Sequence, residues 1–98
     1  MAQRITEKML QHLCDRLNEA TGSPMQPYSI KPGAERHTAN IGNYHISHAY
    51  GGVCLHRMHN ESGGVSCPLS QGHRPKRELY DQMWAMLAGI EIAREVQA

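Results

Sequence analysis

Residues 40–60, which read NIGNYHISHAYGGVCLHRMHN, decide the fold of this chain. Two β-prone runs flank a Tyr-Gly-Gly turn, where glycine supplies the positive φ that a tight hairpin needs. We predict one strand over residues 39–50, interrupted or bulged at Gly42, and a return strand over residues 53–59. A hairpin this short is stable only when another element covers one of its faces, so the flanking segments must provide that cover.

Amphipathic patterns on both sides of the hairpin can provide it. Apolar residues recur at helical spacing over residues 5–20, with Thr6 as the expected N-cap and Gly22 as the left-handed residue after the helix. A second apolar stripe runs over residues 75–96, where Pro75 suits the first helical position. The residues that we expect to be buried in the core are Leu13, Leu17, Leu79, Met83, Trp84, Leu87 and Ile90.

The segments between these elements are punctuated by proline and glycine. Pro24 and Pro27 exclude a helix there, while Pro32-Gly33 predicts a turn with room for a short strand on either side. A third short strand is expected over residues 65–67. The predicted fold is α+β, a single domain over residues 1–98 in the order α-β-β-β-α, with an antiparallel sheet and both helices on one face.

Composition limits the classes of function. Ten Lys and Arg against nine Asp and Glu leave a net charge of +1, whereas a protein that binds nucleic acid by charge alone shows a clear basic excess. Three widely spaced cysteines suit a reducing compartment better than secretion. With no apolar leader and no membrane-spanning run in the sequence, we predict a cytoplasmic protein with no membrane partner.

Cysteines and histidines along the hairpin raise the question of a metal. Cys54 and His56 share one face of the return strand, and with Cys67 and His73 a four-ligand zinc site can be drawn. Structural zinc sites usually take their ligands in close pairs from tight turns, yet the sequence has no Cys-x-x-Cys, and His56 and His59 point to opposite faces. We therefore predict no metal and no cofactor.

A thiol enzyme is the catalytic interpretation of the same residues. Cys54 can lie opposite a histidine of the neighbouring strand, as activation of a nucleophilic thiol requires. The sequence shows no nucleophile elbow and no phosphate-binding loop, and its two Gly-Gly pairs are better explained as turns. We predict no catalytic residues and no enzymatic activity, and keep a small metal- or thiol-dependent enzyme as the third alternative.

The strongest surface signal is a group of cations around the start of the last predicted helix. Cations at a helix N-terminus oppose the helix dipole, so an anion or an acidic partner would compensate for them. We expect these side chains to lie close together at one end of the sheet, with further anchors on the exposed face of the hairpin. The predicted binding residues are Arg57, His73, Arg74, Lys76 and Arg77, followed by Tyr44, His48 and Tyr50.

Seven short motifs cover nearly the whole chain: TGSP at 21–24, PY at 27–28, NIGNYH at 40–45, YGG at 50–52, LHRM at 55–58, GGV at 63–65 and GHRPKRELY at 72–80. Together they resemble a family of small uncharacterised proteins encoded by tailed bacteriophages and prophages. The resemblance implies a phage origin, and with it the cytoplasm of a bacterial host. It implies no activity.

The α-β-β-β-α order also resembles a double-stranded-RNA-binding domain. Residues 17–19 with 27–28 are similar to the end of that family's first helix, and Lys76-Arg77 resembles its phosphate-contacting basic cluster. The chain departs from the family where Pro75 interrupts the basic cluster, and where large residues replace the small ones of the last helix. This resemblance implies nucleic-acid binding through the last helix.

Size, charge and resemblance together predict a non-enzymatic phage accessory protein that binds a host or phage macromolecule. A protein is the first choice of partner, and inhibition of a host defence complex is the role that origin and size suggest. Nucleic-acid binding is the alternative, and the metal- or thiol-dependent enzyme comes third. The sequence assigns no oligomeric state.

Overall fold

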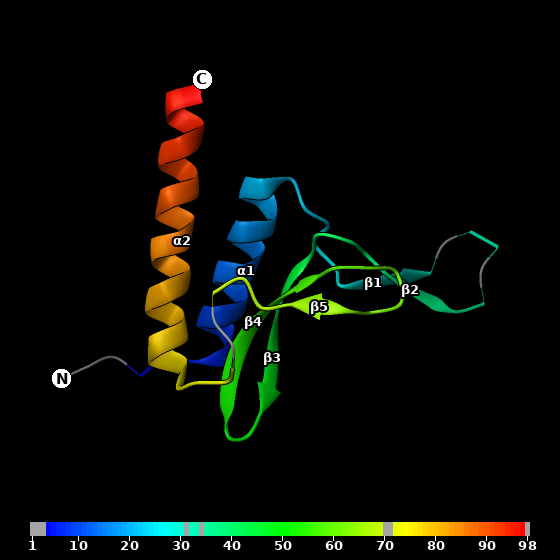
Figure 1. The fold of residues 1–98 in the computed structure, drawn as a ribbon, viewed down its shortest axis with the longest axis horizontal. Helices are drawn as coiled ribbons and strands as arrows, with labels where there is room; N and C mark the ends of the chain where they lie inside the picture. Colours follow the sequence, from blue (N-terminus) through cyan, green and yellow to red (C-terminus); the bar gives the residue numbers. More distant parts are fainter. Residues whose placement is uncertain (1–3, 31, 34, 70–71, 98) are drawn as a thin grey trace.

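The computed structural model describes residues 4–30, 32–33, 35–69 and 72–97 (Figure 1). It confirms the α+β layout: one helix precedes and one follows the strands in the sequence, and the strands form two separate antiparallel sheets. The elements are α1 (Glu7–Thr21), β1 (Tyr28–Ile30), β2 (His37–Ala39), β3 (Tyr44–Ala49), β4 (Gly52–Met58), β5 (Val65–Ser66) and α2 (Lys76–Gln97).

Both helices begin and end close to their predicted boundaries. The hydroxyl of Thr6 accepts a hydrogen bond from the backbone N–H of Met9 at 3.2 Å, as expected of an N-cap. Gly22 follows α1 with φ 68°. Pro75 lies just before α2 rather than as its first residue, and its carbonyl accepts from the N–H of Leu79 at 3.3 Å. Local capping signals therefore locate both helices to within about two residues.

The β3–β4 hairpin turns one residue earlier than the sequence suggested. Ala49 pairs with Gly52, so Tyr50 and Gly51 are the central residues, with φ 53° and 73°. Positive φ at both central positions is the geometry of a type I′ turn. Gly52 is needed for another reason: a Cβ there would lie 2.8 Å from the carbonyl oxygen of Arg74, which pairs with the neighbouring residue of β4.

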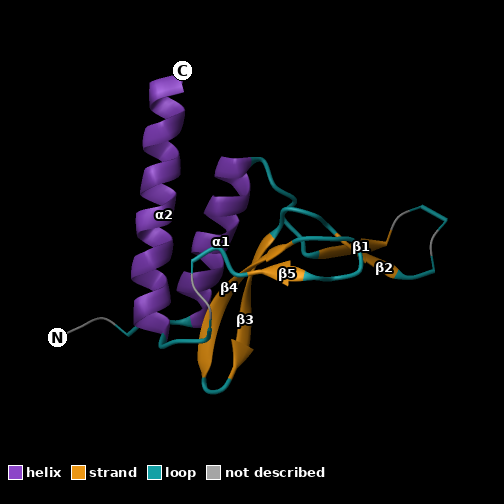
Figure 2. Ribbon diagram, in the orientation of Figure 1, coloured by secondary structure: helices purple, strands orange, loops and turns teal. Residues whose placement is uncertain are grey.

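The predicted interruption at Gly42 is a change of sheet. Upstream of it, β2 pairs with β1 around the Pro32-Gly33 turn, which confirms the short strands predicted there. Downstream, β3 pairs with β4, and β4 with β5. Asn43 fastens the junction, because its side-chain amide donates to the carbonyl of Pro24 at 2.7 Å. The β1–β2 hairpin consequently projects away from the helices (Figure 2).

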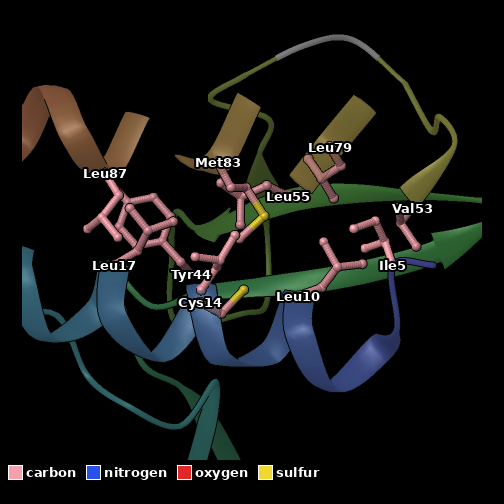
Figure 3. Packing of buried hydrophobic residues seen from close by; sticks show 11 residues of the cluster. Ile5, Leu10, Cys14, Leu17, Tyr44, Val53, Leu55, Leu79, Met83 and Leu87 are labelled. Carbon is pink, nitrogen blue, oxygen red and sulfur yellow. The ribbon is translucent and has the colours of Figure 1, made fainter. Parts of the chain in front are cut away.

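Residues of β3 and β4 alternate between two faces, and one face carries the core. Cross-strand partners share a face, which groups Tyr44 and Ile46 of β3 with Val53 and Leu55 of β4. Side chains from both helices pack against this group (Figure 3). Both helices therefore cover the same face of the three-stranded sheet, and we call the opposite side its outer face. The buried cluster comprises Ile5, Leu10, Leu13, Cys14, Leu17, Tyr44, Val53, Leu55, Leu79, Met83 and Leu87.

Two of the seven predicted core residues are not fully buried. Trp84 is 39% exposed, and Ile90 is only partly buried. α2 contacts the core through Leu79, Met83 and Leu87, a row at four-residue spacing, and Trp84 is turned by about 100° from this row. Ile90 lies further along α2, which extends well beyond the end of α1 (Figure 1). The apolar stripe on α2 therefore extends beyond the part of the helix that α1 and the sheet cover.

No helix in the described ranges combines the length and the apolar character that crossing a membrane would require.

Candidate functional site

The cations that were predicted to form one patch lie at two separate places along β4. The backbone of Arg74 pairs with Val53, close to the hairpin turn. Arg57 lies four residues further along the strand, a separation of about 13 Å. Its guanidinium stacks over the ring of Tyr44 at 5.3 Å. The expectation that Arg57 joins the cluster at the start of α2 is therefore wrong.

Intramolecular partners engage the cations near the start of α2. Arg74 is partly buried, its Nη1 donates to Oε1 of Gln82 at 2.8 Å, and its backbone makes two hydrogen bonds with Val53. Lys76 lies 3.5 Å from the carboxylate of Glu7. Arg77 is exposed on the first turn of α2. Arg74 thus fastens the loop before α2 to the sheet, which is a structural role.

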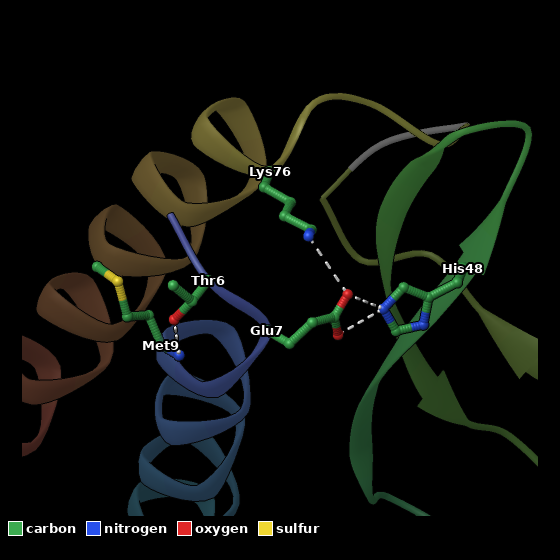
Figure 4. A network of polar contacts seen from close by, with 5 residues as sticks. All are labelled: Thr6, Glu7, Met9, His48 and Lys76. Carbon is green, nitrogen blue, oxygen red and sulfur yellow. Dashed lines mark hydrogen bonds and ion pairs between the residues drawn. The ribbon is translucent and has the colours of Figure 1, made fainter. Parts of the chain in front are cut away.

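Glu7 supplies an anion of α1 beside the start of α2. It lies in the first turn of α1, between Lys76 and His48 (Figure 4). His48 Nε2 is 2.7 and 2.8 Å from the two carboxylate oxygens. The hydrogen bond from His48 lowers the pKa of Glu7, and the charge of Lys76 lowers it further. A carboxylate also suits a helix N-terminus, so Glu7 offsets the cation at the start of α2.

The three predicted hairpin anchors lie in different environments. Tyr44 is only 5% exposed and belongs to the core, so the expectation that it lies on an exposed face is wrong. Its position on the helix-facing side of β3 explains the burial. His48 is exposed but engaged by Glu7. Tyr50 is 98% exposed at the turn, with its ring 5.8 Å from that of His73.

A groove of about 280 Å³ lies between the first turns of α1 and the adjoining part of α2. Trp84 and Tyr80 form its α2 side, with their rings edge to face at 6.3 Å. Met9 and Leu13 contribute from α1. No sequence pattern predicted this groove, because its two walls are helix faces whose relative angle depends on tertiary packing.

Basic side chains line the α1 edge of this groove. Lys8, His12 and Arg16 follow one another at four-residue spacing, which places them on one side of α1. Lys8 and His12 line the groove directly. The Arg16 guanidinium lies 4.9 Å from the centre of the Trp84 ring and forms a 3.0 Å ion pair with Glu91. The groove therefore combines an aromatic wall with a basic edge.

The outer face of the sheet gathers cysteines and histidines. The ligand atoms of Cys54, His56 and Cys67 all lie within 4.8 Å of one another. The ring of His56 lies 5.7 Å from that of His45 and 6.1 Å from that of His73. Ligand spacing in the sequence argued against such a cluster, but strand pairing brings separate segments together.

Electrostatics on this face do not favour a nucleophilic thiol. Burial raises the pKa of Cys54, and its hydrogen bond with Cys67 raises it further. Burial lowers the pKa of His45 and of His56, and in each case the neighbouring histidine adds to the shift. An activated cysteine has a lowered pKa and a histidine base that can accept its proton.

Comparison of the chain with protein-family models, with curated proteins and with solved structures finds no match.

Proposed function

We propose that this protein is a non-enzymatic binding module, and that the groove between α1 and α2 holds an apolar segment of a partner protein flanked by carboxylates. The observation that carries the proposal is Trp84, which lines the groove and is 39% exposed. Exposed aromatic side chains in a concave apolar surface are typical of residues that dominate protein–protein binding energy.

The groove suits a side-chain anchor rather than a whole ligand. Its volume of about 280 Å³ can take one or two apolar side chains, and Trp84 and Tyr80 supply rigid walls. Burying a tryptophan of this kind at the centre of an interface stabilises a complex by about 2 kcal/mol or more. The surrounding helix faces would form the rest of the contact.

Charge favours an acidic partner. Lys8 and His12 line the groove, so carboxylates beside the apolar anchor would meet basic side chains. A protein is favoured over nucleic acid, because the net charge is +1 and Arg16 and Lys76 are already paired with carboxylates.

The biological role that we propose follows from the phage resemblance and not from the groove. A small phage-encoded binding protein would act on a host or phage protein in the bacterial cytoplasm, and a host defence complex is the partner that we propose first. Occupying a surface of such a complex requires no catalytic group, in keeping with the raised pKa of Cys54.

Affinity capture with matched variants tests the proposal. The wild-type chain and Tyr50→Asn, which alters an exposed aromatic remote from the groove, should retain the same partner protein. Trp84→Ala and Lys8→Glu should each lose it while keeping the wild-type circular dichroism. Since Trp84 is the sole tryptophan, its fluorescence should shift to the blue when the purified partner binds.

Two results would overturn the groove as the site. One is a partner lost by the double variant Lys76→Glu with Arg77→Glu but retained by Trp84→Ala, which would move binding to the start of α2. The other is recovery of nucleic acid whose binding falls steeply with salt, because phosphate contacts and not apolar burial would then supply the affinity.

A further inference from the structure

We propose that Cys54, His56 and Cys67 bind a zinc ion on the outer face of the three-stranded sheet. Two thiolates and one imidazole form a ligand set that zinc prefers, and a water molecule completes the tetrahedron in zinc sites with three protein ligands. The site is separate from the groove, which lies on the helix layer.

Strand pairing explains why the three residues meet. Cys54 and His56 are two residues apart on β4, so both side chains lie on the same face. β5 pairs with β4 so that Ser66 lies opposite Arg57. One further step of this antiparallel register places Cys67 opposite His56. Two ligands therefore come from β4 and the third from the residue that follows β5, next to a register fixed by backbone hydrogen bonds.

The distances match a metal site more closely than a disulfide. The Sγ atoms of Cys54 and Cys67 are 3.6 Å apart. Two thiolates on a tetrahedral zinc, each with a Zn–S bond of about 2.3 Å, lie about 3.8 Å apart. A disulfide would require about 2.05 Å. The His56 nitrogen, within 4.8 Å of both sulfurs, needs to approach to about 3.6 Å, a shift that a small side-chain rotation supplies.

Polar groups surround the Cys54 thiol. The backbone of Gly72 and the charge of Arg74 oppose the rise in the pKa of Cys54 that burial and Cys67 cause, without cancelling it. His73, between these two residues in the chain, hydrogen-bonds to Ser47, which is the cross-strand neighbour of Cys54. Hydrogen bonds to ligand sulfurs and a polar outer shell are characteristic of protein metal sites.

Metal binding to the full-length protein tests the proposal. The protein is purified with a non-thiol reductant, stripped of metal, mixed with zinc chloride and passed through a desalting column. We expect one zinc per chain and a higher melting temperature with zinc than without. Cobalt(II) in place of zinc should give the thiolate charge-transfer absorption of a tetrahedral site.

Matched variants assign the ligands. Cys54→Ser, His56→Ala and Cys67→Ser should each lose stoichiometric zinc and the thermal shift, while His59→Ala should keep both, because His59 lies outside the ligand group. A reduced, folded wild-type protein that retains no zinc and shows no cobalt–thiolate band would overturn the proposal. Zinc retained equally by Cys67→Ser would do the same, and neither result depends on whether a variant folds poorly.

Discussion

Replacing Asn18 with alanine should remove the polar contact that fastens α1 to β3. Asn18 is only 1% exposed. Its side-chain amide donates to the carbonyl of Tyr44 at 3.0 Å and accepts from the N–H of the same residue at 2.7 Å. β3 lies at the edge of the β3-β4-β5 sheet, so the amide pairs with it as a neighbouring strand would.

The expected loss of stability follows from these two bonds. Alanine leaves a buried N–H and a buried carbonyl without partners, at about 1–3 kcal/mol each. Because alanine has a better helix propensity than asparagine, the substitution also stabilises α1 by roughly 0.5 kcal/mol. The net loss is about 2–5 kcal/mol, a large part of the roughly 5–15 kcal/mol of a typical domain. At about 4–8 °C per kcal/mol, the melting temperature should fall by at least about 8 °C.

Urea denaturation followed by circular dichroism measures the change. The midpoint for Asn18→Ala should fall without a change in the slope m. Asn18→Asp should not restore stability at neutral pH, because it keeps the acceptor for the N–H of Tyr44 but loses the donor to its carbonyl. Gln11→Ala on the exposed side of α1 is the control, expected to stay within about 0.5 kcal/mol of the wild type. A loss below about 1 kcal/mol for Asn18→Ala would mean that water replaces the amide, and would refute the reasoning.

Three further changes test other parts of the structure. Gly52→Ala should cost about 1–3 kcal/mol in urea denaturation, since its Cβ would lie 2.8 Å from a backbone oxygen of the opposing loop. Folding lowers the pKa values of His45 and His56, so these histidines are protonated first in the unfolded chain as the pH falls. Stability should therefore fall as the pH drops below about 6.5. His45→Asn should reduce this fall in melts at several pH values. Trp84→Ala should cost clearly less than the roughly 3–5 kcal/mol of a buried tryptophan, whereas Leu87→Ala should cost about 2–5 kcal/mol; equal losses from both would show that Trp84 is part of the core.

The parts of the fold that the sequence predicted are those specified by local chemistry. Thr6 caps α1 through a residue three positions away. The hairpin follows from a Tyr-Gly-Gly turn between two β-prone runs, although the one-residue error in its centre moves every cross-strand partner by two residues. Signals of this kind act over a few residues and need no knowledge of the tertiary structure.

The candidate sites depended on packing that no local pattern encodes. The exposure of Trp84 depends on the angle at which α2 meets α1, since its helical stripe is the same whether it is covered or open. The approach of Cys67 to Cys54 depends on the register of β5, a strand of two residues. The sequence placed Cys54 and His56 on one face and included Cys67 among the possible ligands, but it did not show which strand the segment of Cys67 would pair with.

The error about the basic cluster at the start of α2 also arose from tertiary packing that the local sequence does not encode. Considered alone, the start of α2 presents cations against its own dipole, and an external anion was the natural inference. In the folded chain, the first turn of α1 lies beside the start of α2, and Glu7 approaches Lys76 to 3.5 Å. An exposed ion pair of this kind contributes little to stability, but it does remove the reason to expect an external anion at this place.

The two proposals can fail independently, because they concern different layers of the molecule. Trp84 and Lys8 lie on the helix layer, whereas Cys54 and Cys67 lie on the outer face of the sheet. Trp84→Ala should therefore abolish partner capture and leave zinc stoichiometry unchanged, and Cys67→Ser should do the reverse in the reduced, folded protein. If Cys67→Ser also lost the partner without any loss of helical structure, the outer face and not the groove would be the surface that the partner contacts, and Trp84 would act only through the packing of α2 on α1.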